Sequence, residues 1–94
     1  MTNPTDEVIA EAIIRLCADR GADKTICPSE VARSLEPEEA RWRSLLPHVR
    51  RVAGTLSDQD SVWIFRKGRR IERDQMRGVI RLGLPRDRRQ RSEQ

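Results

Sequence analysis

The sequence is poor in the residue types that most often build catalytic or metal sites. Its 94 residues include one histidine, two cysteines, one phenylalanine, two tryptophans and no tyrosine. A structural zinc site normally takes four ligands, so these cysteines and this histidine are too few. No serine or cysteine has a base partner by spacing, and no glycine-rich phosphate loop is present. We therefore expect no enzyme activity, cofactor, metal or small-molecule substrate.

Long hydrophobic runs are also missing. No apolar run approaches the roughly 20 residues that a membrane helix needs. The first six residues lack a basic region followed by an apolar stretch, so we expect no signal peptide. The expected location is the cytoplasm, with reduced thiols. Cys17 is then a small core residue, and Cys27, just before Pro28, stands at a helix N-terminus that would favour its thiolate.

Lysine is scarce, and the charges are divided unevenly along the chain. Seventeen of the 19 basic residues are arginine. Met1–Ala40 has a net charge of −5, whereas Arg41–Gln94 has a net charge of +9. A basic half in a small domain indicates a polyanionic partner. An arginine-rich proteome would give the same bias, so the charge alone does not show that the partner is a polyanion.

Three segments have the apolar spacing of amphipathic helices. The first spans about Asp6 to Arg20, with Thr5 as its N-cap and Gly21 at its end. The second begins at Pro28, where Glu30 can form a capping box, and it stops before Pro37. Both helices are therefore bounded by residues suited to helix ends.

The third helix is expected from Ser44, as its cap, to about Ser57, with Pro47 in its first turn. The segment Glu36–Arg43 is then a connection that can hold one turn of helix, with Trp42 anchored in the core. The side of this helix that faces away from the core is expected to carry Pro47, Arg51, Gly54 and Asp58, flanked by His48, Arg50 and Thr55.

The C-terminal half changes to a strand pattern. Ser61–Arg66 is rich in β-forming residues, and Gly78–Leu82 returns as a second strand. The turn signal Lys67–Gly68 opens a charged connection that is long for a tight hairpin. Lys24–Ile26 is a candidate small strand. Residues 85–94 are almost wholly polar, so we expect a single domain over 1–84 and a disordered basic tail over 85–94.

The element order predicts an α+β fold. Three helices alone would leave the face with Trp63, Phe65, Val79 and Leu82 uncovered, and a hairpin packed on the helices buries it. This arrangement is a winged helix-turn-helix, with three helices and a C-terminal β-hairpin wing over Lys67–Arg77. The alternative is a three-helix bundle with a hairpin of another topology.

Several segments also resemble a known family. Lys24–Arg33, Trp42–Arg50, Lys67–Arg69 and Arg77–Leu82 are similar to the signature of the bacterial domain of unknown function 3253. The likeness covers roughly Asp6 to Leu84. It implies a winged-helix-like fold and no established activity. Some members are fused to a small cysteine-rich module, which this sequence lacks.

Non-catalytic binding of duplex DNA is the function that we predict from this fold. The second helix of the motif would enter the major groove while arginines hold phosphates. The absence of Asn and Gln from Ser44–Ser57 leaves few side chains for reading bases. The expected contact residues are Arg41, Arg43, His48, Arg50, Arg51, Thr55, Lys67, Arg69, Arg70 and Arg73.

A protein-interaction module without nucleic-acid binding is the alternative. The acidic side of the first helix, with Glu7, Glu11 and Asp19, could contact the basic half of a partner or of a second copy in a homodimer. Ile14 lies off the main apolar stripe of this helix. It is either an exposed contact residue or a core residue covered by the C-terminal segment.

Overall fold

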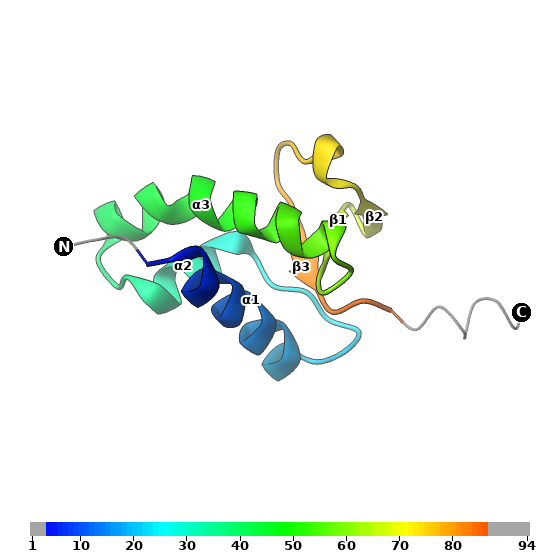
Figure 1. Ribbon diagram of the computed structural model, residues 1–94, viewed down its shortest axis with the longest axis horizontal. Coiled ribbons are helices and arrows are strands. Elements are labelled where there is room, and N and C mark those ends of the chain that lie inside the picture. Colours follow the sequence, from blue (N-terminus) through cyan, green and yellow to red (C-terminus); the bar gives the residue numbers. More distant parts are fainter. Residues whose placement is uncertain (1–3, 87–94) are drawn as a thin grey trace, which may run out of the picture.

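The computed structural model describes residues 4–86, in which three helices precede a three-stranded antiparallel sheet (Figure 1). This is an α+β fold consistent with a winged-helix-like arrangement, as the sequence predicted. None of the helices within residues 4–86 combines the length and the apolar character needed to span a bilayer. The elements are α1 (Asp6–Arg20), α2 (Pro28–Leu35), α3 (Glu39–Asp58), β1 (Trp63–Arg66), β2 (Arg69–Ile71), the 3-10 helix η1 (Arg73–Gln75) and β3 (Arg81–Gly83).

The ends of α1 and α2 follow the local signals in the sequence. The hydroxyl of Thr5 accepts a hydrogen bond of 3.3 Å from the backbone N–H of Val8. Gly21 ends α1 with a φ of 123°, a conformation that side chains rarely adopt. The carboxylate of Glu30 accepts a hydrogen bond of 3.0 Å from the backbone N–H of Cys27. The predicted caps of both helices are therefore confirmed.

The predicted start of the third helix was wrong. Helix α3 begins at Glu39, five residues before Ser44, and the Ser44 hydroxyl donates to the Arg41 carbonyl at 2.7 Å instead of capping. The additional turn is made of good helix formers and includes the Arg43–Glu39 ion pair. It also places Trp42 partly buried against the core. Helix α3 continues through Pro47, although an interior proline removes one backbone hydrogen bond and its ring crowds the carbonyl four residues earlier.

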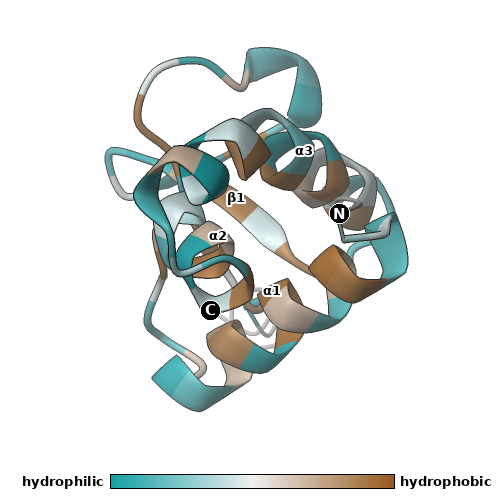
Figure 2. Cartoon of the chain, turned by 90° about the vertical axis from the view of Figure 1, so that its left-hand side faces the viewer, coloured by the Kyte–Doolittle hydropathy of each residue, from teal (hydrophilic) through white to brown (hydrophobic). Residues whose placement is uncertain are grey.

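The core lies between the three helices and one face of the sheet. The apolar sides of the helices turn toward one another and toward β1 (Figure 2). Cys17 is fully buried, as predicted, whereas Ile14 is 39% exposed and points away from the core. The largest side chains that contribute to the core include Ile9, Ile13, Val49, Ile64 and Leu82.

The sheet has the strand order β2-β1-β3, so its pairing differs from the predicted hairpin. Lys67 and Gly68 have φ values of 53° and 80°, which fit a two-residue turn that joins β1 directly to β2. The segment Lys67–Arg77, predicted as a long connection between two strands, therefore contains strand β2 and the 3-10 helix η1. The final strand begins only at Arg81, and Val79, which we expected in the core, is 81% exposed.

Ile26 connects the early part of the chain to the sheet. It forms an isolated antiparallel bridge with Leu82 through backbone hydrogen bonds of 2.7 and 2.8 Å. The predicted short strand at Lys24–Ile26 is thus reduced to one bridging residue. Of the tail expected at 85–94, residues 87–94 lie outside the described part, and the Arg86 guanidinium lies 4.8 Å from the centre of the Phe65 ring.

Candidate nucleic-acid interface

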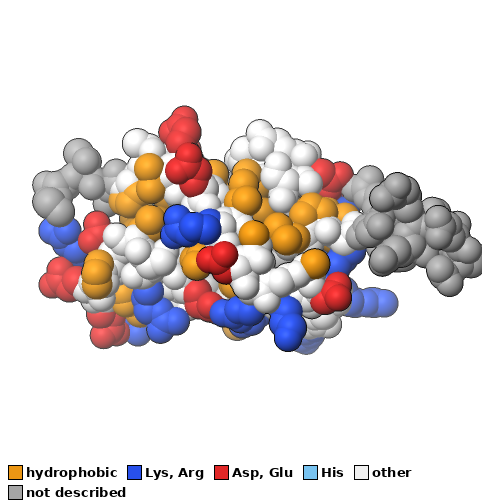
Figure 3. All heavy atoms as spheres, turned by 90° about the horizontal axis from the view of Figure 1, so that it is seen from below, with side chains coloured by type: hydrophobic (Ala, Val, Ile, Leu, Met, Phe, Trp, Pro, Cys, Tyr) orange, Lys and Arg blue, Asp and Glu red, His pale blue; other side chains and the backbone are white. Residues whose placement is uncertain are grey.

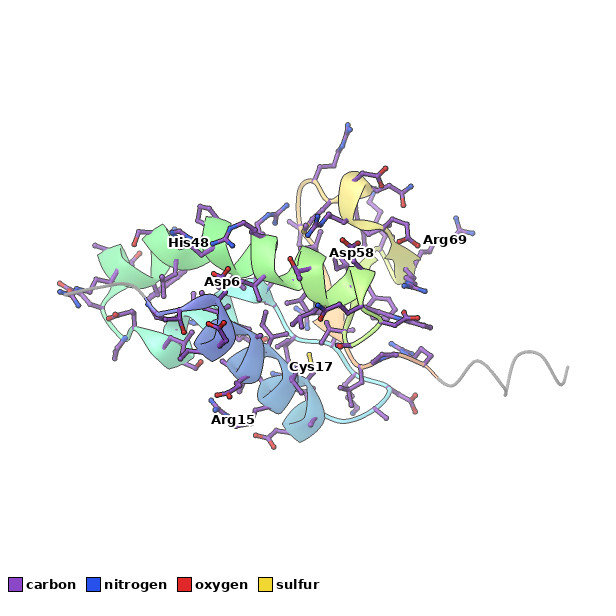
Figure 4. All side chains as sticks on the ribbon, viewed as in Figure 1. Asp6, Arg15, Cys17, His48, Asp58 and Arg69 are labelled. Carbon is purple, nitrogen blue, oxygen red and sulfur yellow. The ribbon has the colours of Figure 1, made fainter. Side chains whose placement is uncertain are left out.

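The ten predicted contact residues come from two segments of the chain. Arg41, Arg43, His48, Arg50, Arg51 and Thr55 lie on α3, whereas Lys67, Arg69, Arg70 and Arg73 lie in the wing, residues 67–77. His48 lies along the first half of α3, and Arg69 points outward at the far end of the molecule (Figure 4). The two sets meet where Arg73 contacts Thr55, whereas Arg69 lies away from α3 at the end of the hairpin.

Arg51 lies at the middle of α3, the helix that we expected to enter the major groove, and it is bound to Asp6 of α1. Its guanidinium donates to both carboxylate oxygens of Asp6, at 2.8 and 3.2 Å. The same guanidinium lies 3.2 Å from Nδ1 of His48. The hydrogen bond from Arg51 lowers the pKa of the Asp6 carboxyl, which keeps this partner ionised. Much of the positive charge at the middle of α3 is therefore balanced within the molecule.

The wing covers the C-terminal half of α3. Arg73 of η1 donates to the Thr55 hydroxyl at 2.9 Å and pairs with Asp58 at 3.4 Å. Gly54, which we expected on the exposed side, is buried beneath this arginine. Thr55 remains exposed, but the contacts of Arg73 with Gly54 and Thr55 place part of the wing on this side of α3.

Three other predicted arginines also have acidic partners. Arg41 pairs with Glu36 and Glu38, at 3.5 and 3.4 Å. Arg43 pairs with Glu39 at 2.8 Å and stacks 4.9 Å from the centre of the Trp42 ring. Arg70 pairs with the carboxylate of Asp60, in the turn between α3 and β1, at 3.1 Å. Its guanidinium also lies 4.2 Å from the centre of the Trp63 ring. These pairs reduce the cationic potential that α3 and its flanks present to a polyanion.

The end of the β1–β2 hairpin is different. Arg66 and Arg69 lie directly opposite each other in the strand register, with Lys67 in the turn between them. Within residues 4–86, none of these three side chains forms an ion pair. Like charges directly opposite on paired strands are destabilising, by a few tenths to about 1 kcal/mol. We call Arg66, Lys67 and Arg69 the hairpin cluster.

Arg66 was missing from the residues predicted from the sequence. It was read as the last residue of a strand and not as part of the wing. The signal that could have identified it is the run of four basic residues around Gly68, because a two-residue turn brings positions 66 and 69 face to face. Arg50, by contrast, was predicted, and it donates to the carbonyl of Gly78 at 3.1 Å.

The thiols and the histidine form no evident reaction centre in the described part of the chain. Cys17 is fully buried, and burial raises its pKa to about 11. The half-buried Cys27 sulfur accepts a hydrogen bond of 3.2 Å from the Ser29 hydroxyl. Across residues 4–86, no three His, Cys, Asp or Glu side chains are grouped as a metal site would require. The expectation of no enzyme activity stays a prediction.

Comparison with known proteins identifies the family of the chain. The family model described as "Protein of unknown function (DUF3253)" matches residues 6–85. A comparison with curated proteins found no match. The matched region includes every helix and strand described above, from the start of α1 to the residue after Leu84. The chain therefore belongs to the DUF3253 family of proteins of unknown function.

Proposed function

We propose that this domain binds duplex nucleic acid without catalysis, and that the hairpin cluster makes the main contact. The observation that carries the proposal is the cross-strand pair of Arg66 and Arg69, with Lys67 in the turn between them. A phosphate backbone would supply the negative charge that this hairpin end lacks within residues 4–86. The contact would recognise the backbone and the groove shape more than the sequence of bases.

The position of the cluster fits this role. Lys67 and Arg69 are exposed, and Arg69 points away from the body of the molecule (Figure 4). The tight turn holds the backbone of the cluster in a fixed conformation, so little further ordering is needed on binding. Helix α3 contributes less, because Arg51 is bound to Asp6 and Thr55 is bound to Arg73.

The test is binding to a short random-sequence duplex, measured by fluorescence anisotropy. Three phosphate contacts predict a log–log salt slope of about −2.7, or a roughly forty-fold loss of affinity between about 50 and 200 mM salt. The double variant Arg66→Gln/Arg69→Gln should reduce the slope to about −0.9. The matched control is Arg15→Gln/Lys24→Gln, which removes the same charge at exposed positions outside the wing.

Two results would contradict the proposal. In one, the wild type shows no salt-sensitive binding at all. In the other, the control variant loses as much affinity as the hairpin variant, which would mean that only net charge matters. Removal of Arg50 and Arg51 together tests the original helix-based prediction in the same assay. We expect it to change the salt slope less than the hairpin variant does.

A protein-interaction role is a second candidate function, and a different observation favours it. An apolar groove lies beside Arg50, on a surface that does not include the hairpin cluster. Val79, at this groove, is the most exposed of the large hydrophobic residues in the described chain. This surface could bind a partner whether or not the hairpin binds nucleic acid.

A further inference from the structure

A mostly apolar groove of about 210 Å³ lies between the start of α2, the middle of α3 and the segment before β3. Pro28 and Leu46 form part of its walls, and Val79 lies at its edge with 81% of its surface exposed. A large hydrophobic side chain is seldom this exposed without a neighbour to cover it. The groove therefore has the character of a docking site for another apolar side chain.

One cationic side chain lines the groove, and further arginines lie along the same side of α3. Arg50 lines the groove, and Leu46 and Trp42 follow at intervals of four residues on the same side of α3. The Trp42 ring has the guanidinium of Arg33 at 5.6 Å and that of Arg43 at 4.9 Å from its centre. Within residues 4–86, neither Arg33 nor Arg50 forms an ion pair. The groove would therefore favour an occupant that is both apolar and acidic.

The outer face of α1 has this composition. Ile14, on this face, is 39% exposed, whereas Val8, which is 42% exposed, is turned about 120° away around the helix. Glu7 and Glu11 lie beside Ile14 on the same side of the helix, and neither forms an ion pair among residues 4–86. On the side of the molecule seen in Figure 3, hydrophobic side chains are interspersed with acidic and basic ones.

We propose that the outer face of α1 in one copy docks in the groove beside Arg50 of a second copy. Ile14 would cover Val79 and Leu46, while Glu11 and Glu7 would approach Arg50 and the neighbouring Arg33. Both the apolar areas and the charges are complementary in this arrangement. The proposal concerns self-association and is independent of the proposed binding of nucleic acid.

The two surfaces lie on different sides of one copy. Helix α1 lies below α3, whereas the segment that leads into β3 lies above it (Figure 1). An interface between two different surfaces is heterologous, and repetition of it adds copies head to tail. Because each surface is small, we expect weak association that grows with protein concentration.

Two exposed substitutions test this arrangement. Val79→Glu places an acidic side chain in the groove and leaves α1 intact, whereas Ile14→Arg places a cation on α1 and leaves the groove intact. In sedimentation equilibrium without nucleic acid, the wild type should increase in mean mass with concentration. Each variant alone should remain a monomer. An equimolar mixture should form a dimer and stop there, since only one functional pair of surfaces remains.

The controls separate this proposal from loss of folding and from the hairpin proposal. Thermal melts should show that both variants fold. If either does not, the pair Arg50→Glu, at a half-buried position, and Glu11→Arg, at an exposed one, replaces them in the same design. The Arg66→Gln/Arg69→Gln variant should associate as the wild type does. A wild type that stays monomeric up to millimolar concentration would overturn the proposal, as would a mixture that stays monomeric while the wild type associates.

Discussion

Gly54 of α3 lies directly beneath the side chain of Arg73, and a Cβ atom at position 54 would stand 2.8 Å from the arginine Nε. Glycine at this place therefore allows η1 to approach the helix. The contact is the structural reason why the wing covers the C-terminal half of α3. A side chain at position 54 would therefore have two opposite effects on stability: it would favour the helix and it would displace Arg73.

Gly54→Ala should change the free energy of unfolding by less than about 0.5 kcal/mol, because alanine favours the helix by up to about 1 kcal/mol while displaced Arg73 loses its surface contacts. The displacement of Arg73 should appear as faster amide hydrogen exchange over residues 72–76. Chemical denaturation and exchange mass spectrometry measure the two quantities. A loss of more than about 2 kcal/mol would mean that Arg73 cannot move aside.

The Asp6–Arg51 pair predicts a stability that depends on pH. The pKa of Asp6 is lowered in the folded state, so its contribution is present above the unfolded value of about 3.9 and is lost as the pH falls through the folded value. Asp6→Asn should therefore lower the Tm at pH 7, and this effect should shrink as the pH falls below the unfolded value. Thermal melts across this range measure the difference.

Glu7→Gln is the matched control for that experiment. Glu7 lies in the same first turn of α1, so it shares the interaction with the helix dipole but not the hydrogen bonds to Arg51. If Glu7→Gln reproduces the pH dependence of Asp6→Asn, the effect belongs to the helix end and not to the ion pair. High salt should reduce the contribution of the pair, because both side chains are exposed.

Adjacent residues Val79 and Ile80 should respond very differently to truncation. Ile80 is 1% exposed, so Ile80→Ala should cost about 2–5 kcal/mol through lost burial and a residual cavity. Val79 is 81% exposed, so Val79→Ala should change the stability by less than about 0.5 kcal/mol. Urea denaturation of dilute protein measures both. Equal losses would place Val79 back in the core, where the sequence had suggested it.

The two thiols should differ in reactivity. Cys17 is fully buried with a pKa raised to about 11, so it should resist alkylation in the native state at pH 8. Cys27 is partly exposed and should be modified first. Peptide mass spectrometry after brief treatment with iodoacetamide identifies the modified residue. Denaturant should remove the difference, and equal native rates would contradict the burial of Cys17.

Much of the fold could be predicted because its signals are local. Thr5, Pro28 and Glu30 mark helix ends through contacts within three residues, and the apolar spacing of α1 and α2 is regular. The start of α3 could not be found in this way. The competing cap signal of Ser44 is local, whereas the packing of Trp42 against the core is a tertiary contact that the helix signals do not report.

The site was predicted less well than the fold, for a related reason. Sequence reasoning identified the cations of α3 but could not show that Asp6, 45 residues away from Arg51, neutralises one of them. The exposure of Val79 likewise depends on where β3 begins, which is set by its pairing with β1. The ion-pair partner of a side chain and the register of a strand both depend on residues far away in the sequence. Composition therefore gives the number of charges but does not show which of them lack a partner in the fold.

The bridge between Ile26 and Leu82 has a consequence for how the chain acquires its structure during synthesis. Helices α1 to α3 can form from local contacts as they leave the ribosome, but the backbone of Ile26 gains its partner only after Leu82 has been added. The domain should therefore close late, in one cooperative step. Until then, nascent chains present the apolar sides of their helices to chaperones and proteases.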